Sequence, residues 1–336
     1  MIETPELYVG KYSSNNFAMA FGEGSELAAT TLRVGQTGAN NSLAASDGGR
    51  VTSENGTLGY WIGSDGNTAS AMGAGSVWSN SGALAVGEHG SDNTLMAFDG
   101  GRIETTALNL GVQTDSSNNT AFAMGAGAVI SADELNIGGT SDAAGGTGNR
   151  VSVLDGGRVE TRDLVIHDGN ELDLNDGGTF AVNNDFNASM NGFNFNEGGT
   201  LEVSGRLTGQ NHYIFGQRTI VMKGGNALWF QPYNHVKVGN YSSGNTLRIL
   251  GGGRVYDRVT YIGEGAGANS NLLEIAGSGS LLKSSWDVLV GEEGQANRMV
   301  IRNGGSVQAD THVFIGVEEE SSGNEVVISG GGASLK

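Results

Sequence analysis

The sequence predicts an all-β protein, a right-handed parallel β-helix with about 24–29 residues and three short strands per coil. Three observations predict this fold: an internal repeat of near-constant length, apolar runs of only three to five residues, and a composition of 58 glycines, two prolines and no cysteine in 336 residues. Self-similarity at such a period is the sequence signature of a solenoid. The composition is typical of many short strands joined by tight turns.

The repeat unit begins with an asparagine, continues with alternating apolar residues and ends in a glycine pair. Clear copies are "NTLMAFDGGRI" from Asn93 and "NTLRILGGGRV" from Asn245. Twelve copies align, starting at Asn16, Asn41, Asn67, Asn93, Asn119, Asn149, Asn170, Asn191, Asn245, Asn271, Asn297 and Asn324. Most copies follow an apolar run that ends in a glycine, at Gly10, Gly35, Gly63, Gly87, Gly111, Gly138, Gly239, Gly263, Gly291 and Gly316.

Each unit predicts three strands. The first strand is the run before that glycine, for example Leu108 and Leu110, whose period-two spacing points both side chains inward. The second strand follows the asparagine, with pairs such as Leu247 and Ile249 inside. After the glycine pair, the third strand carries one inward residue, such as Val255.

Residues that recur once per coil should form ladders. Their copies stack about 4.8 Å apart, so asparagine amides can hydrogen-bond to one another and to the turn backbone. Glycine suits corners that need a positive φ or leave no room for a Cβ atom. We expect structural ladders at Asn41, Asn67, Asn93, Asn119, Asn149, Asn245, Asn271, Asn297, Gly48, Gly100, Gly156, Gly252 and Gly304. A phosphate-binding glycine loop is the functional alternative, but such a loop precedes a helix, and the sequence predicts none.

A second period lies inside the first. Coils that contain "DGGR" alternate with coils that contain "GEGS" or "GAGS", which gives a super-repeat of about 50 residues. The pattern is lost once, so we expect a β-helix block of eight coils at 1–203, an irregular insert or divergent coil at 204–236, and a block of four coils at 237–336. The chain ends in mid-coil, and we expect the solenoid to continue further or to be covered by a neighbour, since solenoids need caps.

The pattern "VG…N-x-L-x-I-x-x-GG-x-V" resembles the repeats of autotransporter (type V secretion) passenger domains and of surface proteins with PEP-CTERM sorting signals. This resemblance covers nearly the whole chain apart from 204–236. It implies a secreted bacterial β-helix with a role in adhesion, self-association or surface structure. It implies no catalytic residue.

The formal net charge of −18 argues against nucleic acid and anionic membranes as partners. No apolar run reaches the length of a membrane helix, and the start "MIETPELYVG" lacks a signal-peptide pattern. Either the chain is cytosolic, or it is a mature piece behind a leader that was removed or left out. The absence of cysteine excludes disulfides. Five histidines lie at unrelated repeat positions and show no metal spacing, at His89, His167, His212, His235 and His312.

An enzyme is the first alternative, because β-helices can host carboxylates that cleave polysaccharides. Candidate groups in "LVIHDGNELDLNDGG" and just before it are Asp155, Asp163, Asp168, Asp173, Asp176 and His167. However, Asp47, Asp99, Asp155 and Asp176 share the turn position before the glycine pair, where Asp is favoured. Arg50, Arg102 and Arg158 follow three residues later and could neutralise them. We therefore expect no catalytic site.

Acidic loops after the first strand are a weak calcium candidate, because carboxylate oxygens are calcium ligands. The residues are Glu88, Glu264, Glu292, Glu293, Glu318 and Glu319, followed by Glu320. A solvated edge that keeps the protein soluble is the alternative. Calcium is therefore a low expectation, and no other cofactor is expected.

The outward positions of the second strand suggest an interaction surface. If pairs such as Ala121 and Ala123 point inward, an apolar stripe points outward, formed by Met19, Phe21, Met72, Met96, Phe98, Phe122, Met124 and Leu154. A contiguous exposed stripe marks a contact surface. A register shift of one residue would instead place these side chains inside. Tyr8, Trp61, Tyr261 and Phe314 are expected at outward positions of the first strand.

These observations predict a non-enzymatic extracellular structural or adhesive β-solenoid that self-associates laterally or end to end, as a surface fibre or adhesin stalk. Its expected partner is itself, with glycans or host and cell-surface proteins as further partners, and neither nucleic acid nor membrane insertion. The alternative is a glycan-binding or glycan-cleaving β-helix, with the acids at 155–176 and aromatic residues near 213–233 lining a groove.

Overall fold

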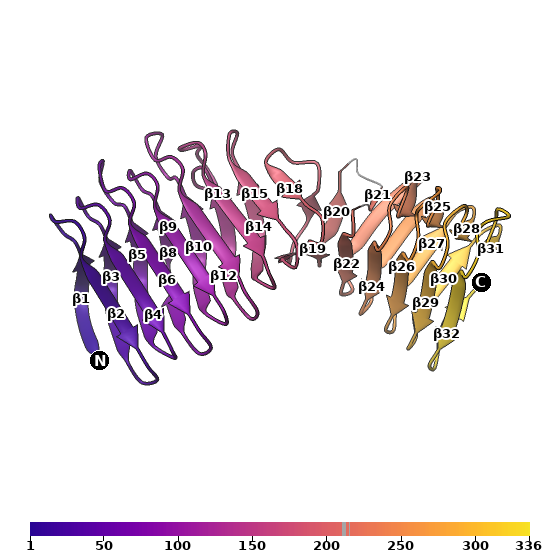
Figure 1. Cartoon of the computed structure of the whole chain (residues 1–336), viewed down its shortest axis with the longest axis horizontal. Helices are drawn as coiled ribbons and strands as arrows, with labels where there is room; N and C mark the ends of the chain where they lie inside the picture. Colours follow the sequence, from indigo (N-terminus) through magenta and orange to yellow (C-terminus); the bar gives the residue numbers. More distant parts are fainter. Residues whose placement is uncertain (210–212, 215) are drawn as a thin grey trace. The chain divides into compact units, whose positions relative to one another are not determined.

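The computed structural model describes residues 1–209, 213–214 and 216–336. Within these residues the chain contains strands and turns but no helix, and neighbouring strands pair in parallel. The strands stack as a β-solenoid of about 13 turns (Figure 1). The predicted all-β parallel β-helix is therefore confirmed.

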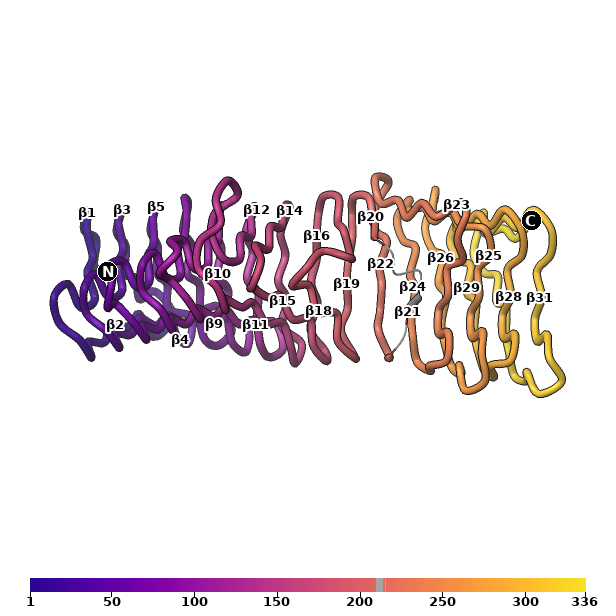
Figure 2. The backbone as a smooth tube through the Cα atoms, turned by 90° about the horizontal axis from the view of Figure 1, so that it is seen from above, coloured from indigo at the N-terminus to yellow at the C-terminus, as the bar shows by residue number. Residues whose placement is uncertain are grey.

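The chain forms two compact units. Unit 1 comprises Met1–Ala181 with Met190–Asn194, and unit 2 comprises Val182–Ser189 with Phe195–Lys336. Figure 2 shows the coils of each unit lying side by side. A regular coil contributes one short strand and one long strand, so each unit has a short-strand sheet and a long-strand sheet.

In unit 1 the short-strand sheet consists of β2 (Phe17–Phe21), β4 (Ser42–Ser46), β6 (Thr68–Met72), β9 (Thr94–Phe98), β11 (Thr120–Met124), β13 (Arg150–Leu154), β15 (Glu171–Leu174) and β18 (Phe193–Phe195). The long-strand sheet consists of β1 (Ile2–Val9), β3 (Glu26–Val34), β5 (Arg50–Leu58), β7 (Val77–Asn80) with β8 (Ala83–Val86), β10 (Arg102–Leu110), β12 (Val129–Ile137), β14 (Arg158–Ile166) and β16 (Thr179–Val182).

In unit 2 the short-strand sheet consists of β19 (Thr200–Val203), β22 (Thr219–Lys223), β24 (Thr246–Leu250), β26 (Leu272–Ala276), β29 (Arg298–Arg302) and β32 (Glu325–Ser329). The long-strand sheet consists of β17 (Phe186–Asn187), β20 (Arg206–Thr208), β21 (Tyr213–Ile214), β23 (Leu228–Val238), β25 (Arg254–Ile262), β27 (Leu281–Ser284), β28 (Val288–Val290), β30 (Ser306–Ala309), β31 (Val313–Ile315) and β33 (Ser334–Leu335).

The long strand joins two of the three predicted strands. In β5, Val51 and Ser53 face the interior, Glu54 and Asn55 are exposed, and Leu58 is inside again. The alternation thus changes phase at Glu54 and Asn55 without ending the strand, and the third strand of one coil continues into the first strand of the next. In other coils the same bend interrupts the pairing, as between β7 and β8.

Around 204–236, where the sequence repeat is lost, strands from different positions of the repeat unit pair with each other inside unit 2. Strand β19 follows a glycine pair, whereas β22 precedes one, yet the two strands pair with Leu201 opposite Ile220. Strand β23 then contains the buried Trp229 and a register shift between Gln231 and His235. His212 lies outside the described residues.

The predicted inward residues form the core. Leu108 and Leu110, Leu247 and Ile249, and the single Val255 are all fully buried. Because every coil places one apolar side chain above the last, the core is a set of stacked rows. Burying each such side chain contributes about 1.5–3 kcal/mol.

The asparagine ladder has the predicted hydrogen bonds. The Asn67 Oδ1 atom accepts hydrogen bonds from the backbone N–H of Asn41 at 2.9 Å and from its Nδ2 at 3.0 Å. Asn67 repeats both contacts with Asn93, and its Nδ2 also donates to the carbonyl of Ser64 at 2.8 Å. Asn67 is fully buried, and so are its counterparts at Asn41, Asn93, Asn119, Asn149, Asn245, Asn271 and Asn297.

The glycine after the first strand is linked to this ladder. Gly35 has a φ of +74°, and a Cβ atom there would overlap the side chain of Asn67. The same overlap occurs between Gly10 and Asn41, and between Gly239 and Asn271. In the third coil the residue at this position is Gly59 rather than the predicted Gly63, since a Cβ atom on Gly59 would overlap Asn93.

The two glycines of each pair serve different purposes. Asp99 and Gly100 both have positive φ, of 44° and 90°, and the N–H of Gly101 bonds to the carbonyl of Phe98 at 3.0 Å. This is a type I′ turn, which needs residues that tolerate positive φ. A Cβ atom on Gly101 would overlap a backbone carbonyl of the preceding coil. The first glycine of the pair is thus needed for its dihedral angle and the second for space.

Candidate interaction surface

The outward face of the short-strand sheet of unit 1 carries the predicted apolar stripe. Of the two registers that the sequence leaves open, the structure has the one with Ala97, Ala121 and Ala123 fully buried. Phe21 is 58% exposed, and Met19 42%. The other stripe residues point to the same face; Met72 is exposed, and the rest are half-buried, at Met96, Phe98, Phe122, Met124 and Leu154.

The stripe is densest along one row of the sheet. Met72 lies opposite Phe98, Phe98 opposite Met124, and Met124 opposite Leu154. Towards β2 the row is interrupted by Ser46. At that end Phe17, 64% exposed and absent from the predicted stripe, adds a further aromatic side chain. These residues form a mostly apolar surface that crosses six strands.

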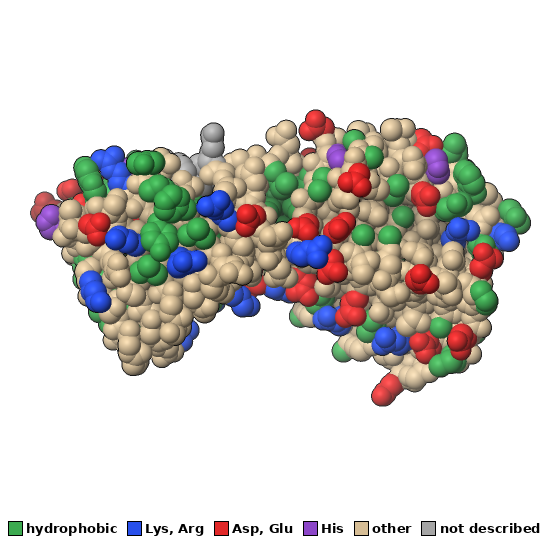
Figure 3. All heavy atoms as spheres, turned by 180° about the vertical axis from the view of Figure 1, so that it is seen from behind, with side chains coloured by type: hydrophobic (Ala, Val, Ile, Leu, Met, Phe, Trp, Pro, Cys, Tyr) green, Lys and Arg blue, Asp and Glu red, His purple; other side chains and the backbone are tan. Residues whose placement is uncertain are grey.

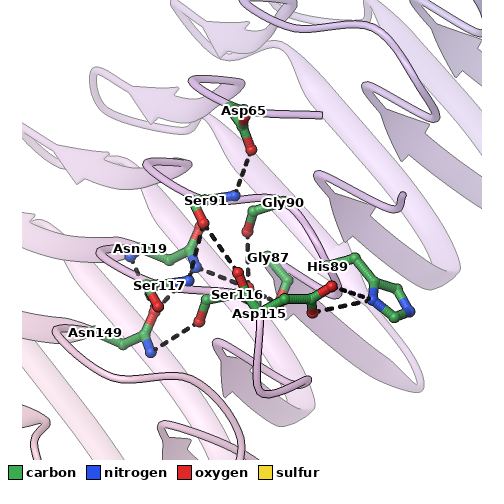
Figure 4. Close-up of polar contacts among 10 residues, drawn as sticks. All are labelled: Asp65, Gly87, His89, Gly90, Ser91, Asp115, Ser116, Ser117, Asn119 and Asn149. Atoms are coloured by element: carbon green, nitrogen blue, oxygen red, sulfur yellow. Dashed lines mark hydrogen bonds and ion pairs between the residues drawn. The ribbon is translucent and has the colours of Figure 1, made fainter. Parts of the chain in front are cut away.

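The polar loops after the first strand are tied to one another from coil to coil (Figure 4). Asp65 Oδ1 accepts a hydrogen bond from the N–H of Ser91 at 2.7 Å, and Asp115 lies 3.1 Å from Nδ1 of His89. The hydroxyl oxygen of Ser116 lies 2.7 Å from the carbonyl oxygens of Gly87 and Gly90 in the preceding loop and donates its one hydrogen there. Several polar side chains of these loops therefore have structural partners.

The acids around 155–176 lie on different parts of the coil. Asp155 and Asp176 occupy successive turns, joined by a backbone hydrogen bond of 2.9 Å. Asp163 is on the long strand and pairs with Arg162 at 2.8 Å.

The other members of this set also have separate surroundings. Asp173 is buried on the short strand, where it pairs with Arg150 and accepts a hydrogen bond from Asn194 at 2.7 Å. His167 Nε2 lies 2.8 Å from the carbonyl of Thr140, and Asp168 is exposed in the adjoining loop. Asp163, Asp168 and Asp173 thus lie on different elements from the stacked turn residues Asp155 and Asp176.

The acidic loop edge of unit 2 brings several glutamates near one another. The pKa of Glu292 is raised by burial and by the neighbouring charges of Glu264 and Glu293. Glu264 pairs with Lys237, and Glu293 accepts a hydrogen bond from the N–H of Ala266 at 2.9 Å.

The corresponding edge of unit 1 holds Glu88, whose pKa is raised by burial, an effect that His89 and Arg33 oppose. Within the described parts of the chain, no three carboxylates or histidines are arranged to hold a metal ion. Calcium binding, which Glu88 and the unit 2 glutamates including Glu318 and Glu319 suggested, stays a prediction.

The arginines after the glycine pairs have glutamate partners rather than the predicted aspartates. Arg102 pairs with Glu104 at 3.0 Å, and Arg158 with Glu160 at 3.1 Å, each two residues along the same strand face. Arg50 reaches Glu26 at a longer 3.9 Å. The side-chain period of two explains this choice, because residues i and i+2 share a face of a strand.

A groove of about 680 Å³ follows the bend of the long-strand sheet in unit 1. It crosses β1, β3, β5 and the residues around β7, and hydroxyls and small side chains line most of it. Two carboxylates, Glu3 and Glu54, lie among them. Such a lining can donate hydrogen bonds to, and accept them from, a polar ligand.

The outward face of the long-strand sheet in unit 2 carries aromatic and cationic residues that the sequence interpretation did not single out. Figure 3 shows hydrophobic side chains with Lys and Arg around them on this unit, at the left of the view. Phe230 and Trp286 are about half exposed, and the guanidinium of Arg258 lies 4.0 Å from the ring centre of Trp286.

A signal for this face is present in the sequence. In unit 1, a glutamate follows each of Arg102 and Arg158 by two residues. In unit 2, the residue two positions after Arg254 is Tyr256, so this arginine lacks the corresponding glutamate. Of the aromatic residues expected outward on the first strand, Phe314 is exposed, whereas Trp61 lies in the loop beyond β5.

No membrane-spanning helix is found in the described residues. Comparison with protein-family models gives no match, and no curated protein matches. Among solved structures, the chain is similar to a TibA fragment hyper-glycosylated by TibC, with 14% identity, 99% of this chain and 93% of that chain covered, and a TM-score of 0.32. A likeness this distant carries no argument about function.

Proposed function

We propose that this chain is a non-enzymatic structural or adhesive β-solenoid of the bacterial cell surface or exterior, and that it associates with copies of itself through the apolar stripe of unit 1. One observation carries the proposal: Phe21 and Met19 are exposed on a regular sheet face that, beyond Ser46, also presents Met72 and Phe98. A soluble protein rarely leaves so extended an apolar row uncovered.

The energetics favour contact along several coils. Burying one exposed Phe or Met side chain contributes about 1.5–3 kcal/mol. Association costs about 4–15 kcal/mol of translational and rotational freedom, so one or two side chains do not suffice. Five of the eight stripe residues are already half-buried, so each of these gains roughly half of that amount, and only contact along the whole stripe reaches an energy comparable to the cost. This comparison supports lateral association over contact at a single coil.

The test is negative-stain electron microscopy with mass measurement in solution, on the native chain and on a Phe21→Ser, Phe98→Ser, Phe122→Ser variant. We expect fibres or paired particles from the native chain and single particles from the variant. A triple Thr68→Ser, Thr94→Ser, Thr120→Ser control changes the same sheet face but removes only one methyl group per site, far less apolar area than the loss of three phenyl rings. Single particles from the native chain would refute the proposal.

A glycan-binding protein is the second candidate, favoured by the groove of about 680 Å³ in unit 1. Hydroxyl and carboxylate side chains there could bond to sugar hydroxyls. The acids at 155–176, by contrast, belong to unit 1, whereas the exposed Phe230 and Tyr233 belong to unit 2. Binding of neutral polysaccharides that is lost on Glu54→Ala, with Asp168→Ala as the control, would favour this candidate.

A further inference from the structure

The outward face of the long-strand sheet of unit 2 combines aromatic rings with arginines whose guanidinium groups form no ion pair with any described residue. We define the aromatic–cationic face as Phe230, Tyr256, Trp286, Arg206, Arg254 and Arg258. The pairing register places Phe230 beside Tyr256, with ring centres 5.9 Å apart. Leu228 pairs with Arg206 on the strand before it and with Arg254 on the strand after it. The backbones of the two arginines are therefore two strand spacings apart, roughly 10 Å.

The arginines of this face differ from most others in the protein. Arg102, Arg158 and Arg298 each lie about 3 Å from a glutamate. In the part of the chain that the structure describes, the guanidinium groups of Arg206, Arg254 and Arg258 form no ion pair, although Asp185 accepts a hydrogen bond from the backbone N–H of Arg206 at 2.7 Å. A set of such cations is unexpected in a protein with a net charge of −18.

The local environment of these arginines leaves them available to an anion. Arg254 donates one hydrogen bond, to the carbonyl of Gly225 at 3.2 Å, while its buried Nε has no partner. Asp257, which lies between Arg254 and Arg258 in sequence, points into the core and bonds to Thr260 at 2.6 Å. The one acid between the two arginines therefore does not neutralise the face.

The distribution of charge between the units makes the face more distinct. Of 18 basic and 36 acidic residues, unit 2 holds 11 and 14, a formal charge of −3, which leaves 7 and 22 for unit 1, a charge of −15. Exposed aromatic rings next to cations suit a ligand that has both apolar C–H surfaces and negative charges. Sugar rings that carry carboxylate or sulfate groups combine these properties.

We propose that the aromatic–cationic face of unit 2 binds an anionic polysaccharide, with Trp286, Phe230 and Tyr256 packing against sugar rings and the three arginines contacting carboxylate or sulfate groups. This proposal is independent of self-association through the stripe of unit 1. Nucleic acid has similar chemistry but is disfavoured, because unit 2 as a whole is still negatively charged and nucleic-acid binding requires broad cationic surfaces.

The test is isothermal titration of the full chain with polygalacturonate, dextran sulfate, neutral dextran and a single-stranded oligonucleotide. We expect binding of at least one of the two anionic polysaccharides, weakened by added salt, and little binding of dextran or the oligonucleotide. A double Arg254→Gln, Arg258→Gln variant should bind roughly tenfold more weakly or worse, because it loses charged hydrogen bonds. Trp286→Ala should weaken binding with less change in its salt dependence.

Arg298→Gln is the matched control, since it removes an arginine of the same unit from the other sheet, where Glu325 already neutralises it. Thermal unfolding of each variant separates loss of binding from loss of fold, and Trp286→Ala provides a second variant if the arginine pair does not fold. The proposal is overturned if neither anionic polysaccharide binds, if the oligonucleotide binds best, or if Arg298→Gln has the same effect. An oligomer that dissociates in the arginine variant, without polysaccharide binding, would mean that the face contacts a second copy.

Discussion

Replacing Asn67 by alanine tests whether the asparagine ladder stabilises the solenoid. The substitution leaves the buried N–H and Nδ2 groups of Asn41 without their shared acceptor, and the carbonyl of Ser64 without its donor. Each buried polar group left without a partner costs about 1–3 kcal/mol. We therefore expect the free energy of unfolding to fall by at least about 3 kcal/mol, measured by urea denaturation followed by circular dichroism.

The coupling between Asn67 and Gly35 makes this test sharper. Alanine at Gly35 must adopt a φ of +74°, which costs about 1–2 kcal/mol, and its Cβ atom would overlap the Asn67 side chain. In the double variant Gly35→Ala, Asn67→Ala, the new Cβ atom no longer overlaps the Asn67 side chain, whereas the cost of the positive φ at residue 35 remains. We expect the loss of stability in the double variant to be smaller than the sum of the single losses by about 1–3 kcal/mol.

Asn109→Ala is the control for this cycle. Asn109 is also an asparagine of unit 1 that bonds to an asparagine of the next coil, accepting from Asn136 at 2.8 Å, but it lies half-buried on an outer face. Its loss leaves only the Nδ2 group of the buried Asn136 without an acceptor, so it should cost about 1–3 kcal/mol, less than Asn67→Ala, which leaves three buried groups without partners. Equal losses from Asn67→Ala and Asn109→Ala, or strict additivity of Gly35→Ala and Asn67→Ala, would refute the reasoning.

Three other substitutions give distinct outcomes. Burial raises the pKa of Asp257 to about 6 from 3.8, so the folded state binds the proton more tightly than the unfolded state and stability falls as pH rises from about 4 to 6. In urea denaturation, Asp257→Asn should therefore be more stable than the native chain by about 3 kcal/mol at pH 8. This difference should shrink towards pH 4 and disappear below it, where Asp257 is protonated in both states. Gly101→Ala should lower the thermal midpoint strongly, because the new Cβ atom would overlap a backbone carbonyl, and an unchanged midpoint would contradict the assigned role. Glu274 is almost buried between Arg248 at 3.2 Å and Arg302 at 2.6 Å. Glu274→Gln should therefore lower the free energy of unfolding by about 1–2 kcal/mol, and by less at high salt. A loss that does not depend on salt would mean that Glu274 contributes through packing and not through charge.

Much of the fold could be predicted from the sequence because the repeat is dictated by backbone geometry. Asn67 and Gly35 stand at fixed offsets since one side chain fills the space that the other leaves. Asp99 and Gly100 recur since both residues of a type I′ turn need positive φ. Requirements of this kind recur in every coil, so the sequence shows them as ladders.

The details that could not be predicted depend on contacts between coils. The bend in β5 falls at Glu54 and Asn55, whereas the equivalent bend in β10 falls at Thr106 and Ala107, which are not typical turn residues. No constant motif marks the bend, so three predicted strands become two in the structure. Strand β22, which precedes a glycine pair, lies beside β19, which follows one, so the two strands come from different positions of the repeat. In the sequence this change is visible only as a loss of the constant motif. Trp61 was predicted on the first strand and Gly63 at the glycine that ends it, but in that coil this glycine is Gly59. Both residues therefore lie in the loop that follows.

The candidate surfaces were harder to predict than the fold, since outward positions are free to differ from coil to coil. The stripe could be named residue by residue, but its register could not be chosen, because alanine and methionine are both acceptable inside. Glutamate partners replaced the predicted aspartate partners of Arg102 and Arg158 because the side-chain period of a strand, not distance along the chain, decides which residues meet.

Neighbouring residues of one strand show how a repeated fold can carry an unrepeated function. Leu95 is fully buried on β9, and the residues at its position in other coils are all apolar because each must fill the same core row. Met96, the next residue, faces outward. At the equivalent outward position in unit 2 the chain has Arg248, which pairs with Glu274. Core rows constrain sequence in every coil, whereas outward rows do not, so adjacent stretches of one solenoid can present an apolar surface and a charged one without any change in the core.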